Sequence, residues 1–266
     1  MFNCILYFFY CMDTEIGGAM YIDFHAHILP GIDDGSENPG QSIRMLLKSR
    51  EQMISTIVGT PHFDPINMNV SDFLIKREHS LEILKMALEC SAIKKATPNI
   101  LCGAECKYIK KISRYPDVEK LCIKGTSYLL LELPYSDWND DVFEEIYLLT
   151  VKRGIFLMIA HPDRFLDQIK KQNAMGKFAE LDCLMQLNVD SLTHILKRKK
   201  GLYLLSGSVP CVLGSDMHSD APDEQMIPRA MNVIERKSGL KFKQRILKIS
   251  EAVLKNTAPS DIKNIW

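Results

Sequence analysis

The sequence predicts an α/β fold in which parallel strands alternate with helices. From Met20 onward, short apolar runs of strand length alternate with amphipathic stretches, which is typical of successive β-α units. The chain has 266 residues, 46% of them hydrophobic and 25% charged, so it can bury a large core. Seven such units with no linker or repeat between them favour one closed or nearly closed barrel. An open doubly wound sheet is the alternative.

The expected elements follow from the apolar pattern. Parallel strands are covered on both faces, so they are expected as continuous apolar runs. These runs are 21–25, 56–60, 99–104, 128–133, 155–160, 183–188 and 210–215. Apolar residues at helical spacing predict helices over 39–54, 71–90, 139–152, 224–237 and 241–255. Pro39 suits the first turn of its helix, and Ser71 is the expected N-cap of the second.

The first 19 residues are set apart from this pattern. Residues 2–11 form an apolar run without basic residues before it, shorter than the roughly 20 residues that span a bilayer. We expect residues 1–19 to be an N-terminal extension, disordered or arising from an upstream start, and residues 20–266 to be one domain. A degenerate signal peptide is the alternative for the extension. No other segment is apolar enough to cross a membrane, so no direct membrane insertion is expected.

Charge and cysteine content narrow the classes of partner and compartment. Lys plus Arg and Asp plus Glu both number 33, which gives no overall attraction to nucleic acid, and no nucleic-acid partner is expected. The eight cysteines form no CxxC pair, which indicates reduced thiols and a cytoplasmic protein. Cys102 and Cys106 flank Glu105, but a lone pair of this kind is expected to be core thiols.

Histidines and acidic residues stand at the C-terminal ends of the expected strands. His25 and His27 end the first strand, and residues i and i+2 of a strand point to the same side, so both rings can face one metal ion. The other candidates are Asp34, His62, Glu105, Glu132, His161, Asp216 and His218. Because these strand ends open on one face of a parallel barrel, the groups are expected to converge. Neutral imidazole and ionised carboxylate are natural ligands of divalent cations, which predicts a metal centre.

Other polar residues are not expected to bind metal. The sixth expected strand ends without a typical ligand and carries Asn188 and Asp190 instead. His79 lies inside a charged helical stretch, and His194 follows an expected helix start at Ser191.

Six segments of the chain follow recognisable motifs. They are MYIDFHAHILPGIDDG (20–35), GTPH (59–62), GAE (103–105), LLLELP (129–134), AHPDR (160–164) and GSDMH (214–218). In these segments the chain resembles the PHP (polymerase and histidinol phosphatase) superfamily, and within it the manganese-dependent tyrosine phosphatases of bacterial capsule and exopolysaccharide operons, the CpsB/YwqE type. The segment 20–35 is the most specific, because HxHxLPGxDDG separates this branch from histidinol phosphatases and polymerase domains.

The resemblance implies a distorted (β/α)7 barrel with up to three divalent metal ions. Manganese is expected, and iron or zinc also suits the ligand types. One ion would be held by His25, His27, Glu105 and Asp216. Glu105 would bridge to a second ion held by Glu132 and His161, and a third would be held by Asp34, His62 and His218. Arg164 matches the arginine that grips the substrate phosphate, and Asp34 is a candidate proton donor.

Two positions depart from the family pattern. The family usually reads TPHH, where this chain has Phe63 in place of the second histidine. An arginine commonly follows the final Asp-x-His, but residues 219–228 contain none and Arg229 comes late. We therefore expect one phosphate or peptide contact to be lost or moved, while the metal ligands are all present.

The implied function is that of a manganese-dependent protein tyrosine phosphatase that uses a metal-activated water. Its implied substrate is the phosphotyrosine tail of a bacterial kinase in capsule or exopolysaccharide assembly. No cysteine is followed by an arginine six positions later, which disfavours a thiol mechanism. Two alternatives stay open: a phosphoesterase for a small phosphate monoester such as histidinol phosphate, and a non-catalytic regulator that binds a kinase. The sequence leaves the oligomeric state undetermined.

Overall fold

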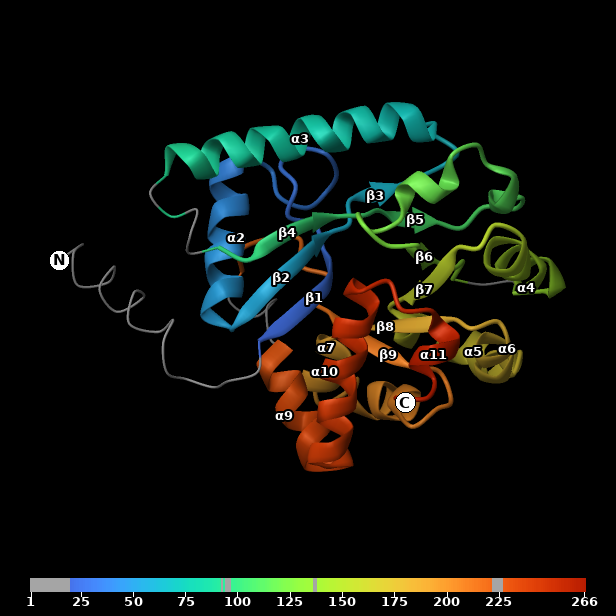
Figure 1. Cartoon of the computed structure of the whole chain (residues 1–266). Helices are drawn as coiled ribbons and strands as arrows, with labels where there is room; N and C mark the ends of the chain where they lie inside the picture. Colours follow the sequence, from blue (N-terminus) through green and yellow to red (C-terminus); the bar gives the residue numbers. More distant parts are fainter. Residues whose placement is uncertain (1–19, 92, 94–96, 136–137, 222–226) are drawn as a thin grey trace.

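The computed structural model describes residues 20–91, 93, 97–135, 138–221 and 227–266. The strands lie in the middle of the molecule, and helices surround them (Figure 1). The expected N-terminal extension, residues 1–19, lies outside the described residues, as does the start of the helix expected over 224–237.

The described residues form nine strands in two sheets. One sheet has the order β1-β2-β4, and the other has the order β3-β5-β6-β7-β8-β9. The strands are β1 Tyr21–Ala26, β2 Ile54–Gly59, β3 His62–Phe63, β4 Asn99–Cys102, β5 Glu105–Lys107, β6 Tyr128–Glu132, β7 Phe156–Ala160, β8 Leu184–Asn188 and β9 Cys211–Gly214. Every pair of neighbouring strands is parallel. The predicted α/β class with parallel strands is confirmed.

Two strands of the first sheet, β2 and β4, are each followed after a short break by a short strand of the second sheet. Two residues separate β2 from β3, and two separate β4 from β5. Backbone hydrogen bonds continue across these breaks, because Gly103 N–H donates to the Gly59 carbonyl (2.9 Å) and Glu105 N–H donates to the Pro61 carbonyl (3.1 Å). At the other end, a single parallel bridge joins Ala26 of β1 to Met217, just after β9. The hydrogen bonds therefore define two sheets, and the expected single closed (β/α)7 barrel is not confirmed.

Helices connect the strands at most of the predicted places. They are α2 Pro39–Glu51, α3 Val70–Cys90, α4 Asp140–Tyr147, α5 Leu166–Lys171, α6 Ala174–Glu180, α7 Asp190–Thr193, α8 Arg198–Leu205, α9 Ile227–Ser238, α10 Leu240–Leu254 and α11 Pro259–Ile262. Pro39 opens α2 as predicted, since a proline at the first helical position lacks only an N–H that has no partner there. A π-helical turn, Leu148–Lys152, continues α4 and completes the helix expected over 139–152.

The N-cap of α3 differs from the prediction. Asn69, not Ser71, caps this helix: its side-chain oxygen accepts the Asp72 N–H (2.9 Å), and its amide donates to the Asp72 carboxylate (2.8 Å). Ser71 already lies in the first turn. Asn and Ser are both good caps, and the sequence offers both within three positions, so the predicted cap is two positions too late.

Alternate strand residues pack into two apolar clusters. In β6, Leu129 and Leu131 belong to the larger cluster, and Tyr128 and Leu130 belong to a second one that includes residues of α10 and α11. Glu132, the last residue of β6, shares the face of Tyr128 and Leu130 because strand residues alternate in direction. This face is therefore apolar along the strand and polar at its C-terminal end.

The described cysteines behave as core thiols. Five of the six are buried, and only Cys90 is exposed. Burial raises the pKa of Cys102 to about 11, so it is a neutral thiol and a poor metal ligand. No helix in the described part of the chain is both long enough and apolar enough to span a membrane.

The cap of α3 gives a stability prediction. Asn69→Ala should lower the free energy of unfolding by about 1 kcal/mol, because it removes the acceptor of the Asp72 N–H. Ser71→Ala is the matched control and should change it by less than about 0.5 kcal/mol. Urea unfolding of both variants measures the difference, and an equal loss in both would contradict the assignment of Asn69 as the cap.

Candidate metal centre

The structure brings all nine predicted ligands together. They come from residues at or just after the C-terminal ends of β1, β6, β7 and β9, from the first residues of β3 and β5, and from the loop after β1. Their donor atoms form three groups, each with all its atoms within 4.8 Å of one another. The groups are His25, His27, Glu105 and Asp216; Glu105, Glu132 and His161; and His27, Asp34, His62 and His218. Two of the groups share Glu105, and two share His27.

Glu105 lies at the middle of this cluster. Its side chain is 1% exposed, and its Oε2 lies 3.0 Å from His25 Nε2 and 3.3 Å from His27 Nε2. The other oxygen, Oε1, lies 2.6 Å from His161 Nε2. A single carboxylate thus faces two groups at once, which is the geometry needed by a ligand that bridges two cations.

His25 in β1 and His27 just after it are held so that their Nε2 atoms face the same point. His25 Nδ1 lies 2.8 Å from Gln186 Oε1, and His27 Nδ1 lies 2.7 Å from Asp33 Oδ2. Both partners are acceptors, so each Nδ1 carries the proton and each Nε2 keeps its lone pair. The two Nε2 atoms are only 3.1 Å apart and face Glu105. Such converging lone pairs repel one another unless a cation lies among them, so the donor set fits a divalent metal.

The two oxygens of the Asp216 carboxylate have different partners: one faces the cluster, and the other is held by residues beside it. Oδ1 lies 3.3 Å from His25 Nε2, whereas Oδ2 accepts from Asn188 Nδ2 at 2.8 Å and pairs with the guanidinium of Arg164. Asn188 is in turn held by Gln186, whose amide donates to Asn188 Oδ1 at 2.8 Å. Gln186 and Asn188 are i, i+2 neighbours on β8, so this strand supplies supports in place of ligands.

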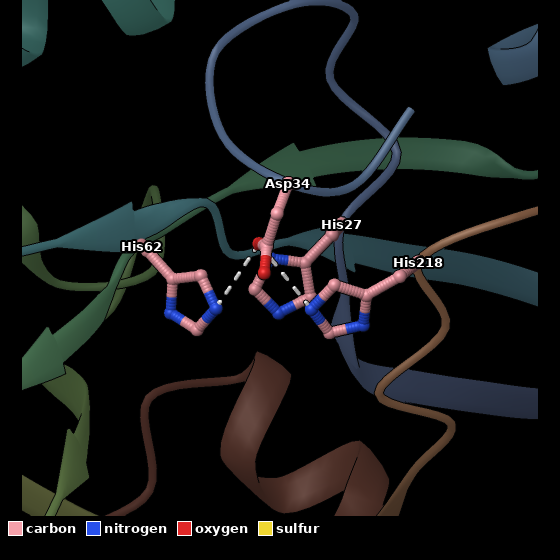
Figure 2. Close-up of side chains that lie close together, drawn as sticks. All are labelled: His27, Asp34, His62 and His218. Atoms are coloured by element: carbon pink, nitrogen blue, oxygen red, sulfur yellow. Dashed lines mark ion pairs between the residues drawn. The ribbon is translucent and has the colours of Figure 1, made fainter. Parts of the chain in front are cut away.

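The third group, drawn in Figure 2, contains the most exposed of the nine side chains, that of Asp34. Asp34 is exposed, and its Oδ1 lies 3.4 Å from His62 Nε2 and 3.6 Å from His218 Nε2. The His218 ring stacks on the His27 ring, with centroids 4.0 Å apart. Asp33 does not face the same side as Asp34: it accepts from the His62 backbone N–H (3.0 Å) as well as from His27. Asp33 therefore acts as a support and Asp34 as the candidate ligand.

The cluster shifts the charge states of its members. Burial alone raises the pKa of Glu105, but His25 and hydrogen bonds from neighbouring imidazoles lower it well below its usual range. Asp216 follows the same pattern, with burial outweighed by His25 and His27, so its pKa is also lowered. Burial lowers the pKa of His25, yet Glu105 and Asp216 raise it above its ordinary value. The two carboxylates are thus anionic and require positive charge beside them. Either protonated imidazoles provide this charge, or metal ions that displace the imidazole protons do.

The backbone is unusual at two of these positions. His161 and Asp216 have positive φ angles of 28° and 56°, which are uncommon for residues with a Cβ and cluster at functional sites. Two glycines let the chain approach closely. A Cβ at Gly35 would lie 2.3 Å from His27 Cβ, and one at Gly214 would lie 2.5 Å from Gln186 Nε2. Neither position can take a side chain without moving a residue of the cluster.

Arg164 lies at the edge of the cluster, in the 3-10 turn Pro162–Phe165 after β7. Its side chain is 39% exposed and pairs with Asp216. Burial lowers the pKa of this guanidinium, but Asp216 raises it, so the side chain stays positive. Because it is exposed on one side and next to the cluster on the other, Arg164 can contact an anion that reaches the cluster from solvent.

The residues not expected in the site lie elsewhere. His79 is exposed on α3, and His194 is exposed at the C-terminal end of α7. Phe63, which replaces the family's second histidine, is buried against Phe73 with ring centroids 5.0 Å apart. Its neighbour His62 points to the opposite side of β3, so the replacement takes no ligand from the cluster. Of the stretch 219–228, which lacks the family's arginine, residues 222–226 lie outside the described residues.

Comparisons with known proteins identify the family of this chain. A family model described as "Capsular polysaccharide synthesis, CpsB/CapC" matches residues 21–255. The chain is 26% identical over 242 residues to the tyrosine-protein phosphatase YwqE of Bacillus subtilis (strain 168), covering 88% of this chain and 92% of the relative. It is 23% identical over 235 residues to the tyrosine-protein phosphatase CpsB of Streptococcus pneumoniae, covering 83% and 92%.

A solved structure shares the fold. The crystal structures of YwqE from Bacillus subtilis and CpsB from Streptococcus pneumoniae are described as those of unique metal-dependent tyrosine phosphatases. One of these chains matches with a TM-score of 0.77 and 24% identity, covering 89% of this chain and 95% of that one.

Gln186 gives a test of the support that β8 provides. Gln186→Met keeps the size of the side chain but removes the acceptor of His25 Nδ1, so the affinity for Mn²⁺ should fall about 10- to 100-fold. Gln244→Met, on the exposed face of α10, is the control and should leave the affinity unchanged. Calorimetric titration of the metal-free proteins measures this, and an unchanged affinity in Gln186→Met would remove Gln186 from the support of the centre.

Proposed function

The chain belongs to the CpsB/CapC family of capsular polysaccharide synthesis, and on that premise we propose that it is a metal-dependent protein tyrosine phosphatase. The observation that carries the proposal is the meeting of nine metal-ligand side chains beside the exposed cation Arg164. The tyrosine-protein phosphatases YwqE and CpsB, which the chain resembles over most of its length, support the same reaction.

We propose that the three groups of side chains hold up to three divalent ions, and that manganese is the ion used. His25, His27, Glu105 and Asp216 would hold the first, Glu105, Glu132 and His161 the second, and Asp34, His62 and His218 the third. Metal ions bound there would supply Lewis-acid charge for the phosphoryl oxygens and activate a water molecule near neutral pH. The mixed imidazole and carboxylate donors suit manganese, iron and zinc alike, so elemental analysis decides among them.

The chain's own residues have three tasks in this reaction. Arg164 binds phosphoryl oxygens through the two-pronged guanidinium, leaving or sharing its contact with Asp216 as the phosphate arrives. The buried supports Asp33, Gln186 and Asn188 hold the ligands in one arrangement before substrate binds. Asp34, which is exposed, can hold a proton for the departing oxygen. A phenol has a pKa of about 10, so a tyrosine leaving group needs little help.

The substrate we propose is a phosphotyrosine-containing protein, in particular the tail of a bacterial tyrosine kinase that acts in capsule assembly. The family's description places it in capsular polysaccharide synthesis, and the relatives' names specify tyrosine-protein phosphatase activity. We also propose a cytoplasmic location, which the buried free thiols support. The bridge between Ala26 and Met217 supports the further proposal that the two sheets form one distorted barrel.

The proposed reaction predicts a metal-dependent activity. The full chain should release phosphate from a phosphotyrosine peptide in the presence of Mn²⁺, and EDTA should abolish the release. Histidinol phosphate, assayed beside it, should be a poor substrate. Release from histidinol phosphate alone would replace the proposal with a small-molecule phosphoesterase. No release from either substrate by the metal-loaded protein would favour a binding regulator.

Arg164 gives a second test of the reaction. Arg164→Ala should lower kcat/KM for a phosphotyrosine peptide about 10²- to 10³-fold, because it removes a donor aimed at the phosphoryl oxygens. Bound metal, measured by elemental analysis, should stay unchanged. Arg153→Ala, which removes a partly exposed arginine paired with Glu119, is the matched control. Wild-type turnover by Arg164→Ala would exclude this residue from the site.

A further inference from the structure

Tyr135 lies at the edge of the metal centre and has no role in the reaction described so far. It follows Glu132 by three residues, and its hydroxyl lies 3.4 Å from Glu132 Oε1. The same hydroxyl interacts with the Arg164 side chain. The hydroxyl end of Tyr135 is therefore beside the place where a phosphoryl group bound by Arg164 would lie.

The ring of Tyr135 leads from this point out to solvent. The residue is 62% exposed. One side of the ring packs edge-on against Phe165, with centroids 5.1 Å apart, and Phe165 is 1% exposed. Phe165 packs in turn on Trp138, whose indole N–H donates to the Pro134 carbonyl (2.6 Å). The side chain is thus held through its hydroxyl and through Phe165, and the rest of it stays exposed.

We infer that the exposed ring of Tyr135 binds the aryl ring of the substrate and so selects aryl phosphate esters over alkyl ones. This inference rests on the proposed phosphatase function. A phosphate bound between Arg164 and the metal centre would lie next to Tyr135, because the hydroxyl of this residue contacts Glu132 and interacts with Arg164. A phenyl ring attached to the ester oxygen of that phosphate can pack on the Tyr135 ring within the 4.5–7 Å separation that aromatic pairs prefer, whereas a seryl or threonyl group has no ring to place there.

The experiment compares two phosphonates that differ only in the ring. Phenylphosphonate and methylphosphonate carry the same anionic head, and neither can be hydrolysed. Their dissociation constants are measured by calorimetry on the full, Mn²⁺-loaded chain and on Tyr135→Ala, Tyr135→Phe and Tyr147→Ala. Tyr147 is a partly exposed tyrosine on α4 and is the control. Equal metal content and equal far-UV circular dichroism show that each variant is folded and loaded.

Tyr135→Ala should raise the dissociation constant of phenylphosphonate about tenfold, because the ring contact is lost. The dissociation constant of methylphosphonate, which makes no ring contact, should change by less than about twofold. Tyr135→Phe should keep wild-type affinity for both, and Tyr147→Ala should match the wild type. With a phosphotyrosine peptide, Tyr135→Ala should raise KM by a similar factor and change kcat little.

Three results would overturn the inference. Equal weakening of both phosphonates by Tyr135→Ala would mean that Tyr135 contacts the phosphate. The same loss in Tyr135→Phe would assign the effect to the hydroxyl, and unchanged affinities would remove Tyr135 from the substrate site. Failure of the proposed function would give a different result, because the wild type would then release no phosphate from the peptide. The ratio of the affinities for phenylphosphonate and methylphosphonate would still show whether the Tyr135 ring contacts an aryl group.

Discussion

The buried carboxylate of Glu105 is the constraint on which the arrangement of this protein depends. A carboxylate that is 1% exposed costs several kcal/mol in lost hydration unless positive charge surrounds it. The chain brings His25 and His27 from β1, His62 from β3 and His161 from the end of β7 within 3.3 Å of its two oxygens. Residues at the ends of β1 and β7 and at the starts of β3 and β5 must therefore meet at one point, and the parallel order of the sheets makes this possible.

The rest of the fold keeps these side chains in place. Gln186 and Asn188 use the polar end of β8 to orient His25 and Asp216, and Asp33 orients His27 from the loop after β1. The same faces of the strands are apolar further from the site, where they pack toward α10 and α11. One set of strand faces thus provides both a dry core and an ordered cluster of ligands.

The sequence predicted the convergence of these side chains better than it predicted the pairing of the strands and the cap of α3. The β-α alternation and the placement of polar residues at strand ends predicted the parallel fold and the convergence of the cluster, because parallel strands end on one side. The division of strands between two sheets was not predicted, since periodicity shows how long an apolar run is but not with which strands it pairs. The cap of α3 was assigned to Ser71 because the sequence does not show which of two good caps makes the bond.

The supporting residues were also missed, although a signal for some of them was present. Gln186 and Asn188 stand at alternate positions in an otherwise apolar strand, and buried polar residues on one strand face need partners. Their role could have been inferred from that pattern. Tyr135 carries no such signal, because a tyrosine after a strand is as often a surface residue as a binding residue.

The metal content of Glu105→Gln tests the central claim most directly, because glutamine keeps the shape of the side chain and removes its charge. Glu145→Gln is the matched control, since Glu145 is also buried but accepts from the Ser113 N–H, away from the cluster. If Glu105 is the shared ligand, elemental analysis should find Glu105→Gln depleted of metal and unable to hydrolyse a phosphotyrosine peptide, with Glu145→Gln like the wild type. A full complement of metal in folded Glu105→Gln would contradict the account.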